Sequence, residues 1–393
     1  MSVKGWKLPR LGFWWSVAGI LLVLLTAIAV VRYTKGLGAV TNLTDGFPWG
    51  LWIGFDILCG VGLAAGGFAI AATVHVFHLE EFKPILRPTI LTAFLGYALV
   101  IVALLFDLGK PWNIWHPIVM WNPRSVMFEV GWCVMLYTTV LFLEFLPVVF
   151  ERFRLGKALK LLAKVSPLLV ILGVILSTLH QSSLGSLFLI LPHKVHPLWY
   201  SPLQPVLFFV SAVAAGLAMT VVESWFSRRA FGRPIETQLL ARLSRTSVVV
   251  LALYLALRLR DLVGRRALQS LFPLTLASWL FLAEILLGVV VPMVALASPW
   301  TRSSPRRLAI AQGMVVLGFI LHRLNVSITA VEAATGYRYL PAVPEFLVTM
   351  GLVALGMLAF AAACRYFPVF PEARVVPEPE AAPAKLRQAV VDA

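Results

Sequence analysis

The residues best suited to chemistry are ionisable side chains placed inside long apolar segments of the chain. A charged group in hydrocarbon costs several kcal/mol unless it faces water or a partner, so each such residue marks a candidate functional site. Carboxyl and phenol groups at successive depths, with water between them, can pass protons because each group binds a proton and releases it after reorienting. The sequence predicts such a pathway through Asp56, Glu129, Tyr97, Glu144 and Glu223.

Each carboxylate in this set also has a purely structural interpretation. Glu144 and Glu223 lie toward the ends of their segments, close in sequence to arginines, where a long side chain can reach the aqueous interface. Asp56 could be held by a hydrogen bond from a neighbouring helix. Glu129 is predicted to lie deeper, because the apolar stretch GWCVMLY follows it. The structural interpretation is therefore weakest for Glu129.

A second set of polar residues lies in two later apolar segments. Arg258 and Asp261 are three residues apart on one face of a helix, so an internal ion pair is expected. Glu284 could meet Arg258 or Arg260 across the gap between two helices. The alternative is a second polar pathway, to which Tyr254 and Glu284 would contribute.

The connection 107–125, DLGKPWNIWHPIVMWNPRS, combines aromatic, basic and amide side chains with three prolines. Any one of its indoles could be an anchor at the membrane surface, where Trp is common. Together they form a stiff, adhesive platform suited to a docked protein partner. The predicted docking residues are Trp112, Asn113, Trp115, His116, Trp121 and Arg124.

Membrane-spanning helices must position these residues. The chain has 393 residues, of which 60% are hydrophobic and 13% charged, and its mean hydropathy of +0.88 is far too high for a soluble protein of this size. About 20 apolar residues cross a bilayer as a helix, so the sequence predicts an all-α polytopic membrane protein with ten spans. The predicted spans cover residues 12–32, 49–77, 88–106, 126–149, 161–181, 203–226, 246–263, 274–298, 308–326 and 344–366.

The second span is predicted to lie at the centre of the helix bundle. Gly and Ala crowd its middle, between Gly60 and Ala72, so neighbouring backbones can approach closely. Pro48 suits the first position of this helix, because the donor that proline lacks would have no partner there.

The basic residues indicate how the chain is oriented. A net charge of +15 would suggest a nucleic-acid partner in a soluble chain, but most of the 33 Lys and Arg residues lie between spans on one side, which favours topology and anionic membrane lipid. We therefore expect no nucleic acid, both termini in a bacterial cytoplasm, and loop 107–125 on the periplasmic side of the inner membrane. Residues 1–370 form the predicted membrane domain, and the Pro-, Ala- and Glu-rich tail 371–393 is predicted to be disordered.

The cysteines and histidines do not form a recognisable cofactor site in the sequence. Cys59, Cys133 and Cys364 lie in apolar segments without CxxC spacing, so no metal site is predicted and iron–sulfur clusters are expected only in partner subunits. Haem b in a membrane bundle usually needs two histidines on facing helices at one depth. Only His180 and His322 match in depth, without being evident neighbours, so no haem is expected.

The run DGFPWGLWIGFDILCGVGLAAGGF, from Asp45 to Phe68, resembles the second membrane helix of the NrfD/polysulfide-reductase membrane-anchor family, most closely its HybB-type branch. The likeness covers most of the chain through its length, its span count and loop 107–125. It implies an integral membrane subunit of a respiratory nickel–iron hydrogenase. The implied partners are a hydrogenase large subunit, an iron–sulfur small subunit and a ferredoxin-like electron-transfer protein, with hydrogen oxidation coupled to quinone reduction.

Two functions from different classes are open at this point. In the first, the chain is a quinone-reactive subunit in which menaquinone or ubiquinone takes two electrons from a periplasmic iron–sulfur partner. Asp56 and Glu129 then supply its two protons near the outer ends of spans one to four, and Tyr97, Glu144 and Glu223 refill them from the cytoplasm. The alternative is a secondary transporter or ion channel, although the sequence lacks the paired, broken-helix repeats typical of transporters.

Overall fold

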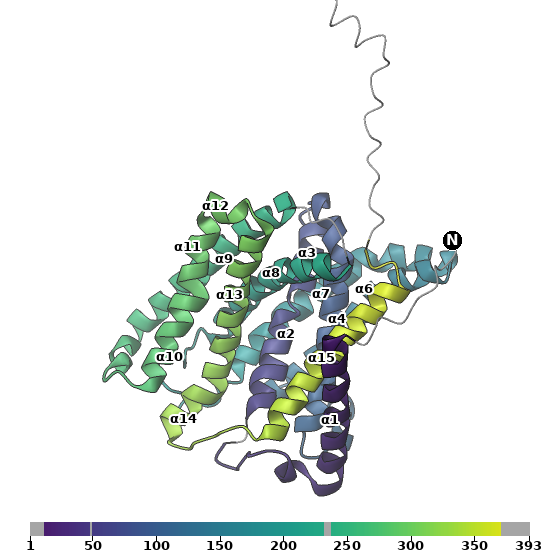
Figure 1. The fold of residues 1–393 in the computed structure, drawn as a ribbon. Coiled ribbons are helices and arrows are strands. Elements are labelled where there is room, and N and C mark those ends of the chain that lie inside the picture. The colour runs from purple at the N-terminus through teal and green to yellow at the C-terminus, as the bar shows by residue number, and fades with distance from the viewer. Residues whose placement is uncertain (1–11, 48, 232–236, 371–393) are drawn as a thin grey trace, which may run out of the picture.

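The computed structural model describes residues 12–47, 49–231 and 237–370. These residues are mainly helical and form no strand, apart from a single bridge between Thr44 and Phe47. Ten helical segments of the described chain are long and apolar enough to cross a membrane (Figure 1), which confirms the predicted all-α polytopic fold and its number of spans. The helix entry predicted at Pro48 and the tail predicted at 371–393 lie outside the described residues.

Most spans are single helices, and two short α-helices lie in the connections between spans. α5 (His116–Val119) belongs to loop 107–125, and α12 (Pro299–Arg302) follows the eighth span. The continuous spans are α1 (Phe13–Lys35), α4 (Lys83–Asp107), α6 (Val126–Arg152), α7 (Gly156–Ser186), α8 (Gln204–Phe231), α9 (Thr237–Gly264) and α15 (Val343–Tyr366).

The other three spans change helix type part-way along their length. Each contains a π-helical segment, a geometry that is rare and often found at functional sites. The segments lie at or beside the buried polar side chains of Asp56, Glu284 and Asn325. The composite spans are η2 (Trp52–Cys59) with α2 (Gly60–Leu63) and α3 (Gly66–His75); α10 (Leu276–Ile285) with η6 (Leu286–Val290) and α11 (Val291–Ala297); and α13 (Pro305–Leu324) with η7 (Asn325–Thr329) and α14 (Ala330–Thr335).

The spans pack as two groups of helices. The first helix group consists of η2–α3, α4, α6 and α7, and the second helix group consists of α8, α9, α10–α11 and α13. In Figure 1 the green helices of the second group stand beside the blue and violet helices of the first. The groups meet where α8 packs against α7 and α3 and where α13 packs against η2. A Cβ atom on Gly66 would lie 2.8 Å from the carbonyl oxygen of Gly216, so the α3–α8 contact requires glycine.

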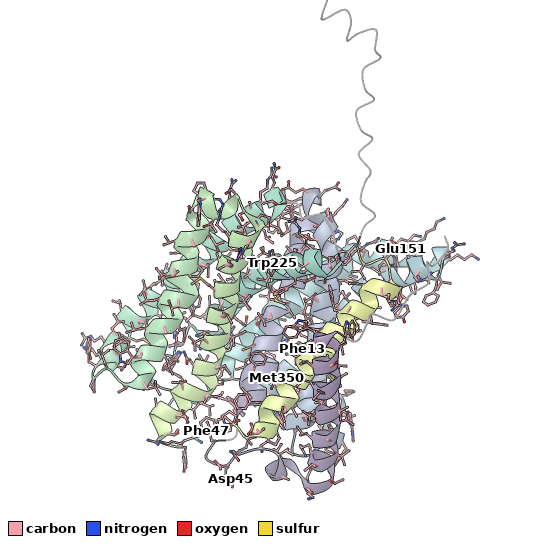
Figure 2. All side chains as sticks on the ribbon, viewed as in Figure 1. Phe13, Asp45, Phe47, Glu151, Trp225 and Met350 are labelled. Carbon is pink, nitrogen blue, oxygen red and sulfur yellow. The ribbon has the colours of Figure 1, made fainter. Side chains whose placement is uncertain are left out.

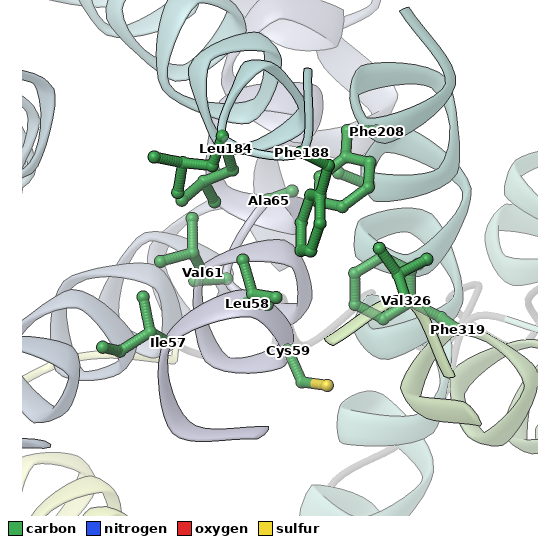
Figure 3. Close-up of a cluster of buried hydrophobic side chains, with 14 of the residues drawn as sticks. Ile57, Leu58, Cys59, Val61, Ala65, Leu184, Phe188, Phe208, Phe319 and Val326 are labelled. Carbon is green, nitrogen blue, oxygen red and sulfur yellow. The ribbon is translucent and has the colours of Figure 1, made fainter. Parts of the chain in front are cut away.

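The predicted central position of the second span is confirmed. In its apolar window 78% of the residues are buried, compared with 6% for α1. Figure 3 shows the cluster around it, in which Leu58 and Val61 face Leu184 of α7 and Phe208 of α8. The small side chains that predicted close packing therefore lie where the two helix groups join.

The first and last spans form a pair outside the two groups. α1 packs along α15, and α15 packs against α4. The Arg32 side chain ties the end of α1 to the end of α4 by donating to the carbonyl oxygens of Phe106 (2.7 Å) and Leu108 (2.5 Å). The group of four neighbouring helices therefore comprises spans two to five, whereas the sequence analysis expected spans one to four to surround the quinone.

The bundle has two ends with different character (Figure 2). Asp45 and Phe47 mark the loop end, which also carries loop 107–125, and Glu151 and Trp225 mark the opposite, basic end. The arginines that follow α6 and end α8 lie at the basic end.

Candidate functional site

One face of α7 carries a line of small and polar residues, which we call the α7 stripe. Its members are three or four residues apart, so they lie above one another on the helix surface. The stripe lies on a helix that packs against α6, and it reaches α4 through Tyr97. It consists of Gly173, Ser177, His180 and Ser183.

Two hydrogen bonds connect the α7 stripe to predicted site residues. The Ser183 hydroxyl donates to Oε1 of Glu129 at 2.6 Å, and the Tyr97 hydroxyl lies 2.9 Å from Nδ1 of His180. The Tyr97 ring also meets the Tyr137 ring edge-on, with centroids 4.7 Å apart. The structure therefore brings Glu129 and Tyr97, which come from different helices, to adjacent turns of α7.

Glu144 lies at the other end of the α7 stripe, opposite a glycine. A Cβ atom on Gly173 would lie 3.6 Å from Oε1 of Glu144 and 3.7 Å from the Tyr137 ring, so the absence of a side chain leaves these groups next to each other. From residue 173 to residue 183 a helix rises about 15 Å. The stripe therefore joins Glu129 at the loop end to Glu144 deep in the group.

Several polar atoms along the α7 stripe are buried without a hydrogen-bond partner among the described residues. Buried polar atoms are nearly always hydrogen-bonded, so water is the expected partner where there is room for it. A carboxyl, two phenols, a serine hydroxyl and an imidazole in this order can pass a proton by exchanging partners. The unpartnered atoms are Oε1 of Glu144, the hydroxyls of Tyr137 and Ser177, and Nε2 of His180.

Glu129 lies nearer to the surface than the sequence predicted. It occupies the first turn of α6, directly after the N-cap Ser125, and its side chain is exposed. A carboxylate in the first turn is stabilised by the helix dipole, which favours negative charge at the helix N-terminus. The predicted span began at residue 126, as α6 does, but the apolar residues that follow Glu129 made its side chain look deeper than the first turn places it.

Asp56 does not lie on the α7 stripe. Its Oδ2 atom accepts a hydrogen bond of 2.8 Å from the hydroxyl of Thr349 on α15, and the side chain is buried. Close by, Glu345 accepts from the Tyr339 hydroxyl and, at 3.0 Å, from the backbone N–H of Asn42. Burial, and then the hydrogen bond to Glu345, raise the pKa of Tyr339 above its usual value. The helix-to-helix hydrogen bond considered for Asp56 is therefore present.

Glu223 occupies a third position, between α8 and α4. It lies close to the hydroxyl of Thr92, and its Oε2 atom has no partner among the described residues. The described part of the chain pairs neither Glu144 nor Glu223 with an arginine. The interpretation in which these acids reach out to basic side chains at the interface is therefore not observed.

The second helix group holds a tightly bonded network around Glu284. Its carboxylate oxygens lie 2.7 Å from Nδ1 of His322 and accept hydrogen bonds of 2.9 Å from Nε1 of Trp199 and from the Asn325 amide. The expected contact between Glu284 and an arginine is absent from its hydrogen bonds. Tyr254 lies beside His322, with ring centroids 6.1 Å apart, and both line a cavity of about 30 Å³ that could hold a water molecule.

The arginines of the second group have other partners than the sequence predicted. Asp261 pairs at 2.6 Å with Arg265, which directly follows the end of α9, and not with Arg258. Arg258 is 0% exposed, donates to the carbonyl oxygen of Leu198 at 2.9 Å and lies over the Phe281 ring. The expected ion pair was wrong because Asp261 reaches Arg265, whereas Arg258 points into the group.

Loop 107–125 forms short helical turns with an exposed apolar surface. Trp112 is 67% and Trp121 is 65% exposed, and Arg124 is also exposed, whereas Asn113 and His116 are partly covered. The loop is braced, since Trp121 packs on Trp132 of α6 with ring centroids 4.8 Å apart. The remaining docking residue, Trp115, is 50% exposed and packs edge-on against His116 at 4.4 Å.

Comparisons with known proteins identify the family. The family model described as polysulphide reductase, NrfD, matches residues 39–333. The chain belongs to the NrfD family. This confirms the resemblance carried by Asp45 to Phe68, and it makes the chain a multi-pass member of a membrane-subunit family.

Two members of the NrfD family have informative names. The chain is 35% identical to the probable Ni/Fe-hydrogenase 2 b-type cytochrome subunit of Escherichia coli, over 90% of this chain and 92% of that protein. It is 28% identical to the integral membrane subunit of a menaquinone reductase from Nitratidesulfovibrio vulgaris, over 86% and 87% of the two chains. A further protein of N. vulgaris is 41% identical over 83% and 86%.

The expectation that no haem is bound is contradicted. The E. coli relative is named a b-type cytochrome subunit, and a b-type cytochrome carries haem. Two imidazoles in this chain share one feature of iron ligands, in which one nitrogen is held by a hydrogen bond and the other is free. In His180 and His322, Nδ1 is held by Tyr97 and Glu284, and Nε2 is buried without a partner among the described residues. The described residues contain no group of three or more His, Cys, Asp and Glu side chains that could hold a metal ion.

Sequence reasoning missed most of the α7 stripe and of the Glu284 network. One usable sign was the polar stretch STLHQSS at the end of an otherwise apolar span, in which Ser177, His180 and Ser183 are three residues apart. The partners Thr349, Trp199 and Asn325 are far away in sequence and carry no such sign.

Proposed function

We propose that this NrfD-family chain is the quinone-reactive membrane subunit of a respiratory redox complex, and that the complex is a hydrogenase. Electrons arrive from an iron–sulfur subunit docked at the loop end. A menaquinone or ubiquinone accepts them and takes up two protons to become the quinol. The proposal places the loop end at the periplasmic face of a bacterial inner membrane and both termini in the cytoplasm.

The observation that carries the proposal is the α7 stripe. Reduction of a quinone requires proton donors held in an apolar wall, and the stripe supplies an exposed carboxyl group at the loop end with a line of polar groups behind it. Glu129, through Ser183, is the donor closest to the docking loop. Tyr97, and then Glu144, return protons from deeper in the first helix group.

The names of two relatives support the choice of substrate and complex. One relative is a subunit of a menaquinone reductase, and another is a subunit of a nickel–iron hydrogenase with the higher identity of the two. Both proteins align with most of this chain. We therefore assign a hydrogenase large subunit, its iron–sulfur small subunit and a ferredoxin-like protein as the partners.

Haem would be held by this chain through the free imidazole nitrogens. Haem b, when bound, supplies reversible transfer of one electron. His180 and His322 are the residues that would hold it, one in each helix group. The hydrogen bonds from Tyr97 and Glu284 would fix the orientation of the two rings.

The experiment that tests the function compares two electron acceptors in the purified complex. Glu129→Gln removes the proton but keeps the size and the hydrogen bond to Ser183, so quinone reduction is expected to fall about a hundredfold. Hydrogen oxidation with a soluble dye bypasses the quinone and is expected to stay unchanged. Glu80→Gln, an exposed carboxylate at the basic end, is the matched control and should leave both rates unchanged.

The outcomes separate a role in proton supply from a structural role. If the dye-linked and quinone-linked rates of Glu129→Gln fall together, the carboxylate supports assembly and the proposal fails. A quinone-linked rate equal to that of the unmodified complex would also reject Glu129 as the donor.

A further inference from the structure

A second and larger cavity lies at the basic end, and no residue of the α7 stripe lines it. Its volume is about 590 Å³, which is within the range of small-molecule sites. Two helices form it, α8 and α13, and among the described residues no carboxylate lines it. The lining residues are Trp225, Arg228, Arg229, Arg306 and Ile310, and we call this cavity the arginine pocket.

The charges of the arginine pocket are not neutralised by the described part of the protein. Arg228, Arg229 and Arg306 take part in none of its ion pairs, and Arg229 lies over the Trp225 ring with 5.1 Å between its guanidinium carbon and the ring centroid. Other basic residues nearby are used internally. Arg302, for example, donates to the carbonyl oxygens of Leu296 and Ala297 at the end of α11. The pocket therefore presents guanidinium groups that are available to an anion.

The surroundings of the pocket place it at the level of lipid headgroups. Trp225 lines it, and Trp300 of α12, near the start of α13, is 68% exposed; tryptophan is enriched at this depth of a bilayer. Along α13 the wall changes from Arg306 to Ile310, which lies one turn further into the span and is 57% exposed. A ligand that fits both parts has an anionic head and an apolar tail.

We infer that the arginine pocket binds the phosphate group of an anionic phospholipid, with an acyl chain running along Ile310. A guanidinium presents a planar pair of donors that matches two phosphate oxygens. Arginines from both α8 and α13 line the pocket, so a lipid with two phosphates can bridge the two helices. The bound lipid would stabilise the basic end of the second helix group, whatever the redox function of the chain.

The test is lipid binding to the purified full chain in detergent. Delipidated protein is titrated with cardiolipin or with phosphatidylcholine, and bound lipid is counted by native mass spectrometry while the unfolding temperature is recorded. Cardiolipin is expected to bind and to raise the unfolding temperature, and phosphatidylcholine is not. The double variant Arg228→Gln and Arg306→Gln is expected to bind cardiolipin about thirtyfold more weakly.

A matched variant shows whether the pocket or the general charge is responsible. Lys157→Gln with Lys160→Gln removes two positive charges from the same end of the bundle, at the start of α7 and outside the pocket. This variant is expected to bind cardiolipin as the unmodified chain does. Equal weakening in both double variants would overturn the proposal, because binding would then follow net charge alone.

Two further measurements distinguish a lipid phosphate from free phosphate and add a conservative variant that keeps the positive charge. Inorganic phosphate at the same concentration is expected to leave the unfolding temperature unchanged, and a shift equal to that of cardiolipin would overturn the lipid assignment. Arg306→Lys keeps the charge but loses the planar donor pair, so its affinity should lie between those of the unmodified chain and the double variant. Unchanged affinity in Arg306→Lys and in the double variant together would reject the site.

Discussion

The two helix groups hold their buried carboxyl groups in different ways. In the first helix group, the side chains along the α7 stripe carry hydroxyl, imidazole and carboxyl groups. Several of these have no hydrogen-bond partner among the described residues. In the second group, three side chains bond one carboxylate, that of Glu284, and the guanidinium groups of Arg258 and Arg323 are 0% exposed. Both groups also contain other polar atoms without a partner among the described residues, so the difference lies in how firmly the carboxyl groups of Glu144 and Glu284 are held.

This difference predicts which side chains can exchange hydrogen-bond partners and which are held in one arrangement. A proton relay requires groups that can change partners, whereas a network whose carboxylate is saturated holds one arrangement. Arg323 is only partly held, since its Nη2 atom donates to the carbonyl oxygen of Phe208 and to Ser211, both at 3.0 Å, and its guanidinium lies over the Phe208 ring, whereas Nε and Nη1 have no partner among the described residues. We therefore expect substitutions in the second group to act mainly on stability and those in the first group mainly on quinone-linked rate.

The largest expected effect is loss of stability in the second group. Glu284→Ala leaves three buried donors without their acceptor, and breaking a buried charged network costs about 3–5 kcal/mol of the free energy of unfolding. Glu144→Ala in the first group removes a carboxyl whose Oε1 atom has no partner, so the cost should be about 1 kcal/mol. Thermal unfolding of both variants in detergent measures the contrast. Equal losses would show that the two groups are held alike.

The next effect is on the rate in the first group. Tyr97→Phe removes the hydroxyl that meets His180, and we expect quinone reduction to fall about a hundredfold with an unchanged dye-linked rate. Tyr254→Phe is the matched variant in the second group, because it removes a buried phenol beside His322, and it should leave both rates unchanged. A comparable fall in the Tyr254 variant would assign the second group to the proton pathway as well.

The sequence predicted the scaffold because the membrane imposes it. Twenty or so apolar residues between polar breaks can only become a spanning helix, so ten spans could be counted directly. The glycines and alanines of the second span likewise predicted its central place, since close helix contacts require small residues. Both features depend on residues that are neighbours in sequence.

The pairing of polar side chains could not be predicted in the same way. Glu284 is hydrogen-bonded to His322 and Trp199, and Asp56 to Thr349. The partners in these pairs are 38 to 293 positions apart in the sequence. Local spacing also failed for Asp261, because residues three and four apart on a helix are equally near and only packing decides between them. The sequence predicted the start of this span at residue 126 correctly, but it did not show that the first turn of α6 leaves Glu129 exposed.

A smaller effect contrasts the two ends of the bundle. Trp112→Ala with Trp115→Ala removes exposed indoles from the loop end, and aromatic anchors of this kind are worth about 2 kcal/mol of binding free energy, or about thirtyfold in affinity. The iron–sulfur partner should therefore be lost during purification. Trp300→Ala removes an equally exposed indole at the basic end and should leave copurification unchanged. Full retention of the partner by the double variant would refute docking at loop 107–125.

The smallest expected effect concerns the connection between the two groups. His196 lies in the loop between α7 and α8, outside the spans, and its backbone N–H donates to the carbonyl oxygen of Ala330 on α14 at 3.0 Å. Burial lowers the pKa of His196 below its usual value of 6.5. The unfolded chain then binds this proton more readily than the folded chain, so the contribution to stability is complete above pH 6.5 and is lost as the pH falls below it.

His196→Gln is expected to remove this part of the pH dependence while keeping the backbone hydrogen bond to α14. Unfolding temperatures measured at about pH 7.5 and about pH 5.5 compare the two proteins, and His116→Gln, in loop 107–125, is the matched control that should keep the dependence. An undiminished loss of stability at low pH in His196→Gln would mean that acid acts within the helix groups. The stability of the helix groups themselves would then depend on pH, and the comparison between the two groups would have to account for it.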